Sequence, residues 1–169
     1  MSAGSIIVLA FLAFVAITIF KGVRIVPQGY KWIVQRLGKY HTTLGPGLNF
    51  VIPYIDEVAY KVTTKDIVLD IPSQEVISRD NAVLLMNAVA YINLTTPEKA
   101  VYGIENYTWA IQNMVQTSLR SIVGEMDLDD ALSSRDHIKA KLKAAISDDI
   151  ADWGITLKTV EIQDIKPSH

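Results

Sequence analysis

The 169-residue sequence contains no cysteine. This absence excludes a disulfide framework, a metal site with thiolate ligands, a cysteine nucleophile and S-palmitoylation. An excess of positive charge is also missing, since 16 Lys and Arg stand against 18 Asp and Glu, and the formal net charge is −2. No overall basic field is available to hold nucleic acid, and we expect no nucleic-acid partner.

The common catalytic motifs are absent as well. The sequence has no G-x-S-x-G, H-E-x-x-H, G-x-x-x-x-G-K-[ST] or G-x-G-x-x-G pattern, and its three histidines are far apart. A calcium loop counted from Asp127 would need Gly and Glu where the chain has Leu132 and Ile138. We therefore predict no catalytic residue, no metal-ligating residue and no cofactor.

What the sequence does have is one long apolar run. The fifteen residues from Ile6 to Phe20 carry no charge, and Thr18 is the only polar residue among them. Counted from Ala3, the run spans about 27 Å as a helix, close to the roughly 30 Å hydrocarbon layer of a bilayer. The predicted membrane-anchor side chains are Ile6, Leu9, Phe11, Leu12, Phe14, Ile17 and Phe20.

Three interpretations of this run compete: a cleaved signal peptide, a buried core helix and a permanent membrane anchor. A signal peptide would have a positive residue before the run and an A-x-A site after it, and the sequence has neither. A helix that is apolar all round is rare in so small a domain. The sequence favours the anchor.

Flanking charges predict the orientation of that anchor. Lys21 and Arg24 follow the apolar run, and nothing positive precedes it. The positive-inside rule therefore places residues 21–169 in the cytoplasm. No Pro or Gly between Ser5 and Lys21 could form the apex of a hairpin, so we expect a single span.

Residues 29–95 are predicted to be rich in strands. Aromatic and β-branched residues indicate one strand over 30–36 and a second over 48–52. Alternating apolar residues over 67–71 predict a third strand that ends at Pro72. A long strand over 82–94 is apolar at odd and even positions alike, which predicts a central strand covered on both faces.

The later part of the chain has helical periodicity. We expect a short helix from Pro97, a helix over 108–124 with one apolar stripe, and a helix over 134–152. Asp127 is predicted to cap a short helix between the last two. Residues 155–165 form a final strand. Strands, then helices, then one more strand predict the α+β class.

Residues 23–27 are too few to let the domain move far from the anchor. We therefore expect the first hairpin to lie close to the bilayer, with apolar and aromatic groups at the headgroup level. An alternative, that these groups form domain core, stays open, and each interpretation could hold for different residues. The predicted membrane-surface contacts are Leu48, Phe50, Val51, Ile52 and Tyr54.

Several short segments together resemble the SPFH (band 7, prohibitin-homology) family. Residues 26–30 (VPQGY), 35–40 (QRLGKY) and 45–53 (GPGLNFVIP) are similar to the opening of that domain, and residues 70–81 resemble the stomatin branch. The similarity extends in order over residues 23–167 and is strongest to bacterial stomatin-like, paraslipin-type proteins. It implies an anchor over 1–22 and an SPFH domain over 23–167.

The resemblance implies a membrane-anchored, non-enzymatic scaffold. Such proteins form homo-oligomeric rings or cages on one membrane face, organise lipid microdomains, and associate with membrane-bound proteases and NfeD-type proteins. The expected location is the bacterial inner membrane, as a single-pass protein whose domain faces the cytoplasm. Alternatives are a membrane-bound hydrolase without a recognisable motif and a monomeric tethered protein-binding module.

Two departures from the family limit the comparison. Eukaryotic stomatins have a proline-bent intramembrane hairpin and palmitoylated cysteines, and this sequence has neither. Members of the family also continue into a C-terminal coiled coil, whereas residues 164–169 close this sequence without any heptad pattern. We therefore expect one of two explanations, which stay open: the sequence is a fragment of a longer protein, or it contains only the ordered part of one.

Overall fold

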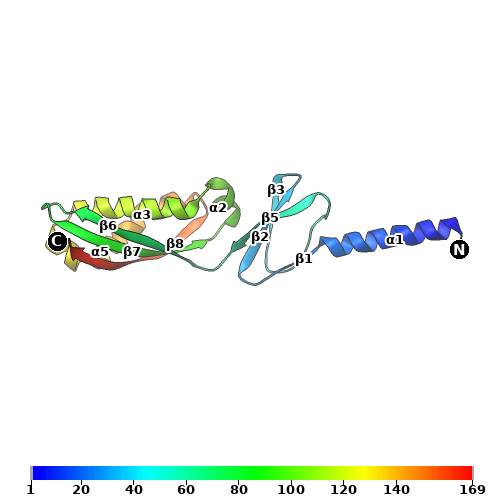
Figure 1. Ribbon diagram of the computed structural model, residues 1–169, viewed down its shortest axis with the longest axis horizontal. Coiled ribbons are helices and arrows are strands. Elements are labelled where there is room, and N and C mark those ends of the chain that lie inside the picture. Colours follow the sequence, from blue (N-terminus) through cyan, green and yellow to red (C-terminus); the bar gives the residue numbers. More distant parts are fainter. Residues whose placement is uncertain (1, 169) are drawn as a thin grey trace. The chain divides into compact units, whose positions relative to one another are not determined.

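A computed structural model describes residues 2–168, and the chain divides into two compact units between Thr64 and Lys65 (Figure 1). The first unit begins with a helix and continues as short strands. Its elements are α1 (Ala3–Gly22), β1 (Val23–Val26), β2 (Tyr30–Arg36), β3 (Lys39–Leu44), β4 (Gly47–Phe50) and β5 (Asp56–Thr63).

The strands of the first unit form two small antiparallel sheets. One has the order β3-β2-β5, and the other pairs β1 with β4. A small apolar core joins these strands, and Trp32 and Val58 pack against it. The buried members of that core are Val26, Val34, Leu44 and Val51.

The second unit is an antiparallel sheet with helices packed on it (Figure 1). The strand order is β6-β7-β8, α3 packs against β6, α5 packs against β8, and the two helices contact each other. Its elements are β6 (Ile67–Ile77), β7 (Val83–Leu94), α2 (Pro97–Gly103), α3 (Tyr107–Gly124), α4 (Leu128–Ser133), α5 (Arg135–Ala151) and β8 (Ile155–Pro167).

The α+β class is confirmed, and so is the central position of the long strand β7. The prediction that β7 is covered on both faces is only half right. Its even positions, from Leu84 to Leu94, are buried. On the opposite face Val83 is 37% exposed, although Val89 is only 8% exposed. The helices cover one face of the sheet, so burial alternates along most of the strand, except around Val89.

The prediction that a strand ends at Pro72 is wrong. β6 runs on to Ile77, and its pairing with β7 shifts register between Ile71 and Gln74. Pro72 is tolerated because β6 lies at the edge of the sheet and the proline falls within that irregularity.

The second predicted strand also differs from the structure. β4 ends at Phe50 rather than at residue 52, and its partner is β1, the segment directly after α1. β2 instead forms a hairpin with β3. This pairing places β4 at the base of α1.

Candidate membrane-binding surface

α1 has the length and composition of a membrane-spanning helix. Its most apolar 18-residue window has a mean hydropathy of 2.7, and none of that window is buried. The seven predicted anchor side chains are between 53% and 81% exposed. A helix whose apolar side chains are mostly exposed needs an apolar surrounding.

Two cations stand at the carboxyl end of this helix. The guanidinium of Arg24 donates to the carbonyl oxygens of Lys21 and Val23, at 3.0 Å for Val23. Lys21 lies in the last turn and is exposed. Both charges therefore complement the negative end of the helix dipole, in addition to flanking the apolar run.

Gly22 joins α1 to the sheet. The backbone N–H of Val51 donates to the carbonyl oxygen of Gly22 at 2.7 Å. A Cβ on Gly22 would lie 2.5 Å from the carbonyl oxygen of Val51, so the two backbones approach as closely as glycine allows. Val51 itself is 9% exposed and belongs to the core, which is the alternative that the sequence left open for it.

The other four predicted contact residues are exposed. Leu48, Phe50, Ile52 and Tyr54 have exposures of 63%, 67%, 47% and 62%. Ile25, 69% exposed, pairs with Leu48 across the β1–β4 ladder. Large apolar side chains thus gather on the segment that follows α1 and on the strand and loop beside it.

An aromatic contact places the loop before β5 beside the middle of α1. The rings of Tyr54 and Phe14 are stacked, with centroids 6.4 Å apart and planes 6° apart. Phe14 lies eight residues before Gly22, which is about 12 Å along a helix axis. Tyr54 therefore stands beside the apolar part of α1 and not merely beside its end.

The structure adds Leu37, which the sequence analysis did not select. Leu37 is 80% exposed and has a positive φ of 53° in the turn between β2 and β3. Its N–H donates to the carbonyl oxygen of Ile55 at 3.0 Å, which holds this turn against the loop that carries Tyr54. The sequence signal that could have identified Leu37 is the presence of a leucine at the tip of a turn, where polar residues predominate.

An ion pair fixes the base of that loop. Asp56 accepts from Nε and Nη2 of Arg36 at 2.7 and 3.1 Å and from the N–H of Ile52 at 2.9 Å. The Asp56 side chain is 3% exposed, and the hydrogen bonds from Arg36 lower its pKa to about 2. The carboxylate therefore stays charged and keeps residues 52–56 closed.

We call the exposed apolar side chains of this end of the first unit the apolar surface. It is built from α1, the β1–β4 pair, the β2–β3 turn and the loop before β5. Its members outside α1 are Ile25, Leu37, Leu48, Phe50, Ile52 and Tyr54.

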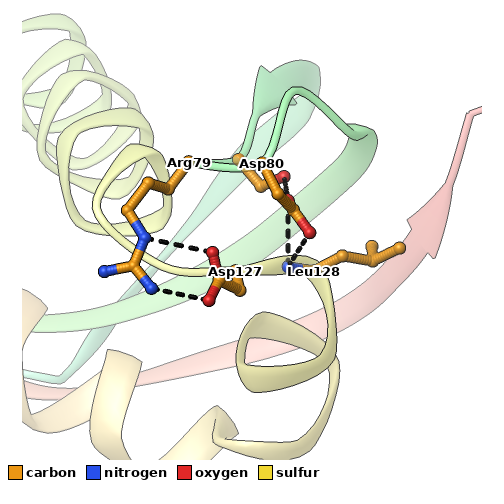
Figure 2. A network of polar contacts seen from close by, with 5 residues as sticks. Arg79, Asp80, Asp127 and Leu128 are labelled. Atoms are coloured by element: carbon orange, nitrogen blue, oxygen red, sulfur yellow. Dashed lines mark hydrogen bonds and ion pairs between the residues drawn. The ribbon is translucent and has the colours of Figure 1, made fainter.

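The second unit contains a network of hydrogen bonds and an ion pair between charged and polar residues, in contrast to the apolar surface of the first unit (Figure 2). Arg79 binds Asp127 at 2.6 and 3.0 Å, and the carboxylate of Asp80 accepts the N–H of Leu128 at 3.2 Å and the hydroxyl of Ser78. These bonds, the one from Ser78 first, lower the pKa of Asp80. The network ties the β6–β7 turn to the start of α4 and presents no base or nucleophile in a catalytic pairing.

Asp127 occupies the N-cap position of α4, as predicted, but its side chain makes no cap hydrogen bond. Arg79 binds that carboxylate, and Asp80 from the neighbouring turn accepts the helix N–H in its place. Within residues 2–168, no three acidic or histidine side chains gather as a metal site would require.

Comparisons with known sequences identify several relatives of this chain. An uncharacterized protein of Methanocaldococcus jannaschii is 40% identical over 149 residues, covering 88% of this chain and 74% of that protein. An uncharacterized protein of Mycobacterium tuberculosis is 34% identical over 165 residues, covering 98% of this chain and 43% of its own length. Human stomatin-like protein 2, mitochondrial, is 37% identical over 140 residues, covering 83% and 39%.

The chain therefore spans about two fifths of the mycobacterial and human relatives that it matches. The sequence model described as "SPFH domain / Band 7 family" matches residues 24–169, from the end of α1 onwards. Because this match takes in most of the sequence, the chain belongs to the SPFH domain / Band 7 family.

Proposed function

We propose that this chain is a membrane-anchored scaffold, in which α1 spans the bilayer and the apolar surface contacts its interfacial layer. Members of the SPFH family are membrane-associated scaffolds, and the stomatin-like relatives support the same general kind. The observation that carries the proposal is the apolar surface itself: an unburied 20-residue helix with six further exposed apolar side chains at its base.

The stacking of Tyr54 on Phe14 supports the proposed interfacial contact. If α1 lies in hydrocarbon, the loop that carries Tyr54 lies at least at the headgroup level, where Tyr and other amphipathic rings are enriched. Leu48, Phe50 and Ile52 then leave water together with the helix. Each fully transferred large apolar side chain contributes about 1.5–3 kcal/mol to membrane association.

The flanking charges orient the proposed span. Lys21 and Arg24 follow the apolar helix, so residues 21–169 face the cytoplasm and the short segment before α1 lies outside. The proposed location is a bacterial inner membrane. The boundaries that we propose are an anchor over 1–22 and an SPFH domain over 23–167.

We further propose that the whole protein assembles into a homo-oligomeric ring or cage that gathers membrane lipids and regulates membrane proteins. Membrane-bound proteases and NfeD-type proteins are the proposed clients. This part rests on the family alone, and the assembly would involve sequence outside the two fifths of the relatives that this chain spans.

The proposed scaffold is not an enzyme. A cavity of about 540 Å³ in the second unit is lined by Ile104, Glu105, Asn106, Trp109 and Ala110. Glu105 is the one titratable side chain of that lining, and a lone carboxylate offers neither an acid–base pair nor an activated nucleophile. This cavity therefore offers no support for the alternative of a membrane-bound hydrolase.

Single cysteines test the topology directly, because the natural chain has none. Ser2→Cys and Lys141→Cys would be expressed separately in sealed cells and treated with a membrane-impermeant maleimide. We expect labelling of position 2 from outside and of position 141 only after lysis. External labelling of position 141 would reverse the orientation, and recovery of a soluble chain without its first twenty or so residues would refute the anchor.

The size of the assembly is measured separately. The longest available form of the protein, extracted with its surrounding lipid, should appear as large closed particles by electron microscopy. Particles of one or two subunits would instead favour a tethered protein-binding module.

A further inference from the structure

The two units carry opposite charge, which the net value of −2 conceals. Residues 1–64 hold six Lys and Arg against two Asp and Glu, a formal charge of +4. Residues 65–169 hold ten against sixteen, a formal charge of −6. The unit that contains the apolar surface is therefore the positive one.

Three of its cations lie around the apolar surface. Lys21 immediately follows Phe20 at the end of α1, and Arg24 lies three residues later in β1. Lys39 pairs with Arg36 across the turn that holds Leu37, and that turn is bonded to Ile55. Lys21 and Lys39 are exposed, and Arg24 is half-buried.

Acidic side chains compensate little of this charge. Asp56 and Glu57 are the two acidic residues of the first unit, and Asp56 is neutralised by its bidentate pair with Arg36. Glu57 alone then stands against three cations at this end.

We propose that Lys21, Arg24 and Lys39 bind the phosphate groups of anionic phospholipids, so that the chain enriches these lipids around α1. The inference rests on the proposed insertion of α1 and names the lipid class that the scaffold gathers. The apolar side chains hold the three cations at the headgroup level, where their stems remain in an apolar layer and their charged ends reach phosphate.

The negative charge of the second unit means that only the first unit is attracted to anionic lipid. A surface of net charge −6 is repelled by an anionic leaflet, whereas the first unit is attracted to it. Each cation near an anionic leaflet strengthens the attraction to that leaflet by about fivefold at physiological ionic strength.

The test uses the intact chain reconstituted in phosphatidylcholine vesicles that contain a trace of spin-labelled lipid. Electron spin resonance measures the fraction of probe whose motion the protein restricts, once with a phosphatidylglycerol probe and once with a phosphatidylcholine probe. We expect severalfold preference for the phosphatidylglycerol probe, falling towards one at about 1 M salt because the charges are screened.

The triple variant Lys21→Gln/Arg24→Gln/Lys39→Gln should abolish the preference, and Lys39→Gln alone should reduce it only in part, because Lys21 and Arg24 keep their charges. Lys141→Gln, which removes one exposed charge from α5, is the matched control and should leave it unchanged. Thermal melting of each variant verifies folding, and Arg24→Lys, which keeps the charge, should retain the preference.

Equal restriction of the two probes by the natural chain would overturn the inference, as would an unchanged preference in the triple variant or an equal loss in the control. In each case the protein still floats with the vesicles, and the anchoring proposal survives. Failure to float would refute the anchoring proposal and this inference together.

Discussion

The two units of this chain solve the problem of apolar burial in opposite ways. Among the described residues, the first unit buries six hydrophobic side chains and exposes twenty large ones, whereas the second buries twenty-five and exposes six. The second unit therefore encloses most of its large apolar side chains within its own fold. The first unit leaves most of its large apolar side chains uncovered by its own fold.

The polar groups of the two units differ in the same sense. In the first unit, the nearly buried carboxylate of Asp56 closes a loop whose other side chains are apolar and exposed. In the second unit, the ion pairs Arg79–Asp127 and Lys139–Glu161 lie at the surface. The ion pair of the first unit thus holds the loop of the apolar surface in place. The ion pairs of the second unit lie between exposed side chains.

Truncation of a leucine in each unit gives the largest contrast. Leu142 of α5 is fully buried between helices and sheet, so Leu142→Ala should lower the free energy of unfolding by about 2–5 kcal/mol. Leu48→Ala should leave the stability in detergent within about 0.5 kcal/mol, because that side chain is 63% exposed. Denaturant titrations of both variants measure the difference.

For membrane contact, we expect the two variants to rank in the opposite order, with the larger effect for Leu48→Ala. Leu48→Ala should reduce quenching of a fluorophore at position 54 by brominated lipid, whereas Leu142→Ala should not. A large loss of stability in Leu48→Ala would show that the apolar surface is internal core, and the contrast between the units would disappear.

A methyl group at the base of α1 should act on the first unit alone. Gly22→Ala places its Cβ 2.5 Å from the carbonyl oxygen of Val51, and relief of that overlap should cost about 1–3 kcal/mol. We expect faster hydrogen exchange at the Val51 amide, which donates to Gly22. Gly45→Ala, with open space around the new Cβ, is the matched control, and equal exchange in the two variants would contradict the prediction.

Much of the second unit could be predicted from local sequence. The apolar stripe of α3 is buried at Ile111, Val115 and Leu119, as the helical spacing predicts, because the period of a helix is visible within a dozen residues. The course of β6 through Pro72 could not be predicted. Tolerance of that proline depends on the strand lying at a sheet edge, which is a property of the topology.

The apolar surface was predictable only in part. Exposed aromatic and aliphatic residues at 48, 50, 52 and 54 are visible in the sequence, but nothing local distinguishes them from the buried Val51. Their position follows from the pairing of β4 with β1, which are separated by twenty residues. Leu37 was missed because a turn bonded to a distant loop leaves no periodic signal.

Acid should weaken the closed loop at the base of the apolar surface. The folded-state pKa of Asp56, about 2, lies below the ordinary value of 3.8. Its contribution to stability, up to about 2 kcal/mol, is therefore complete above about pH 4 and lost as the pH falls through 2. Asp56→Asn should lose this part of the pH dependence.

Thermal melting in detergent between pH 5 and pH 2 measures that effect. The melting temperatures of the natural chain and Asp56→Asn should converge as the pH falls, since both then have an uncharged side chain at position 56. Parallel curves would mean that the pair with Arg36 does not set the acid sensitivity of this unit.

The smallest effect is expected for a surface charge of the second unit. Lys139 binds Glu161 at 2.7 Å, which lowers the pKa of Glu161, but the two side chains are 36% and 54% exposed. Water and salt screen such a pair, so Lys139→Gln should leave the melting temperature unchanged within error. It should also leave lipid preference unchanged, although it removes the same charge as Lys39→Gln. A measurable loss of lipid preference would mean that lipid preference depends on the total charge of the chain and not on the cations of the first unit. The two units would then differ only in the exposure of their apolar side chains.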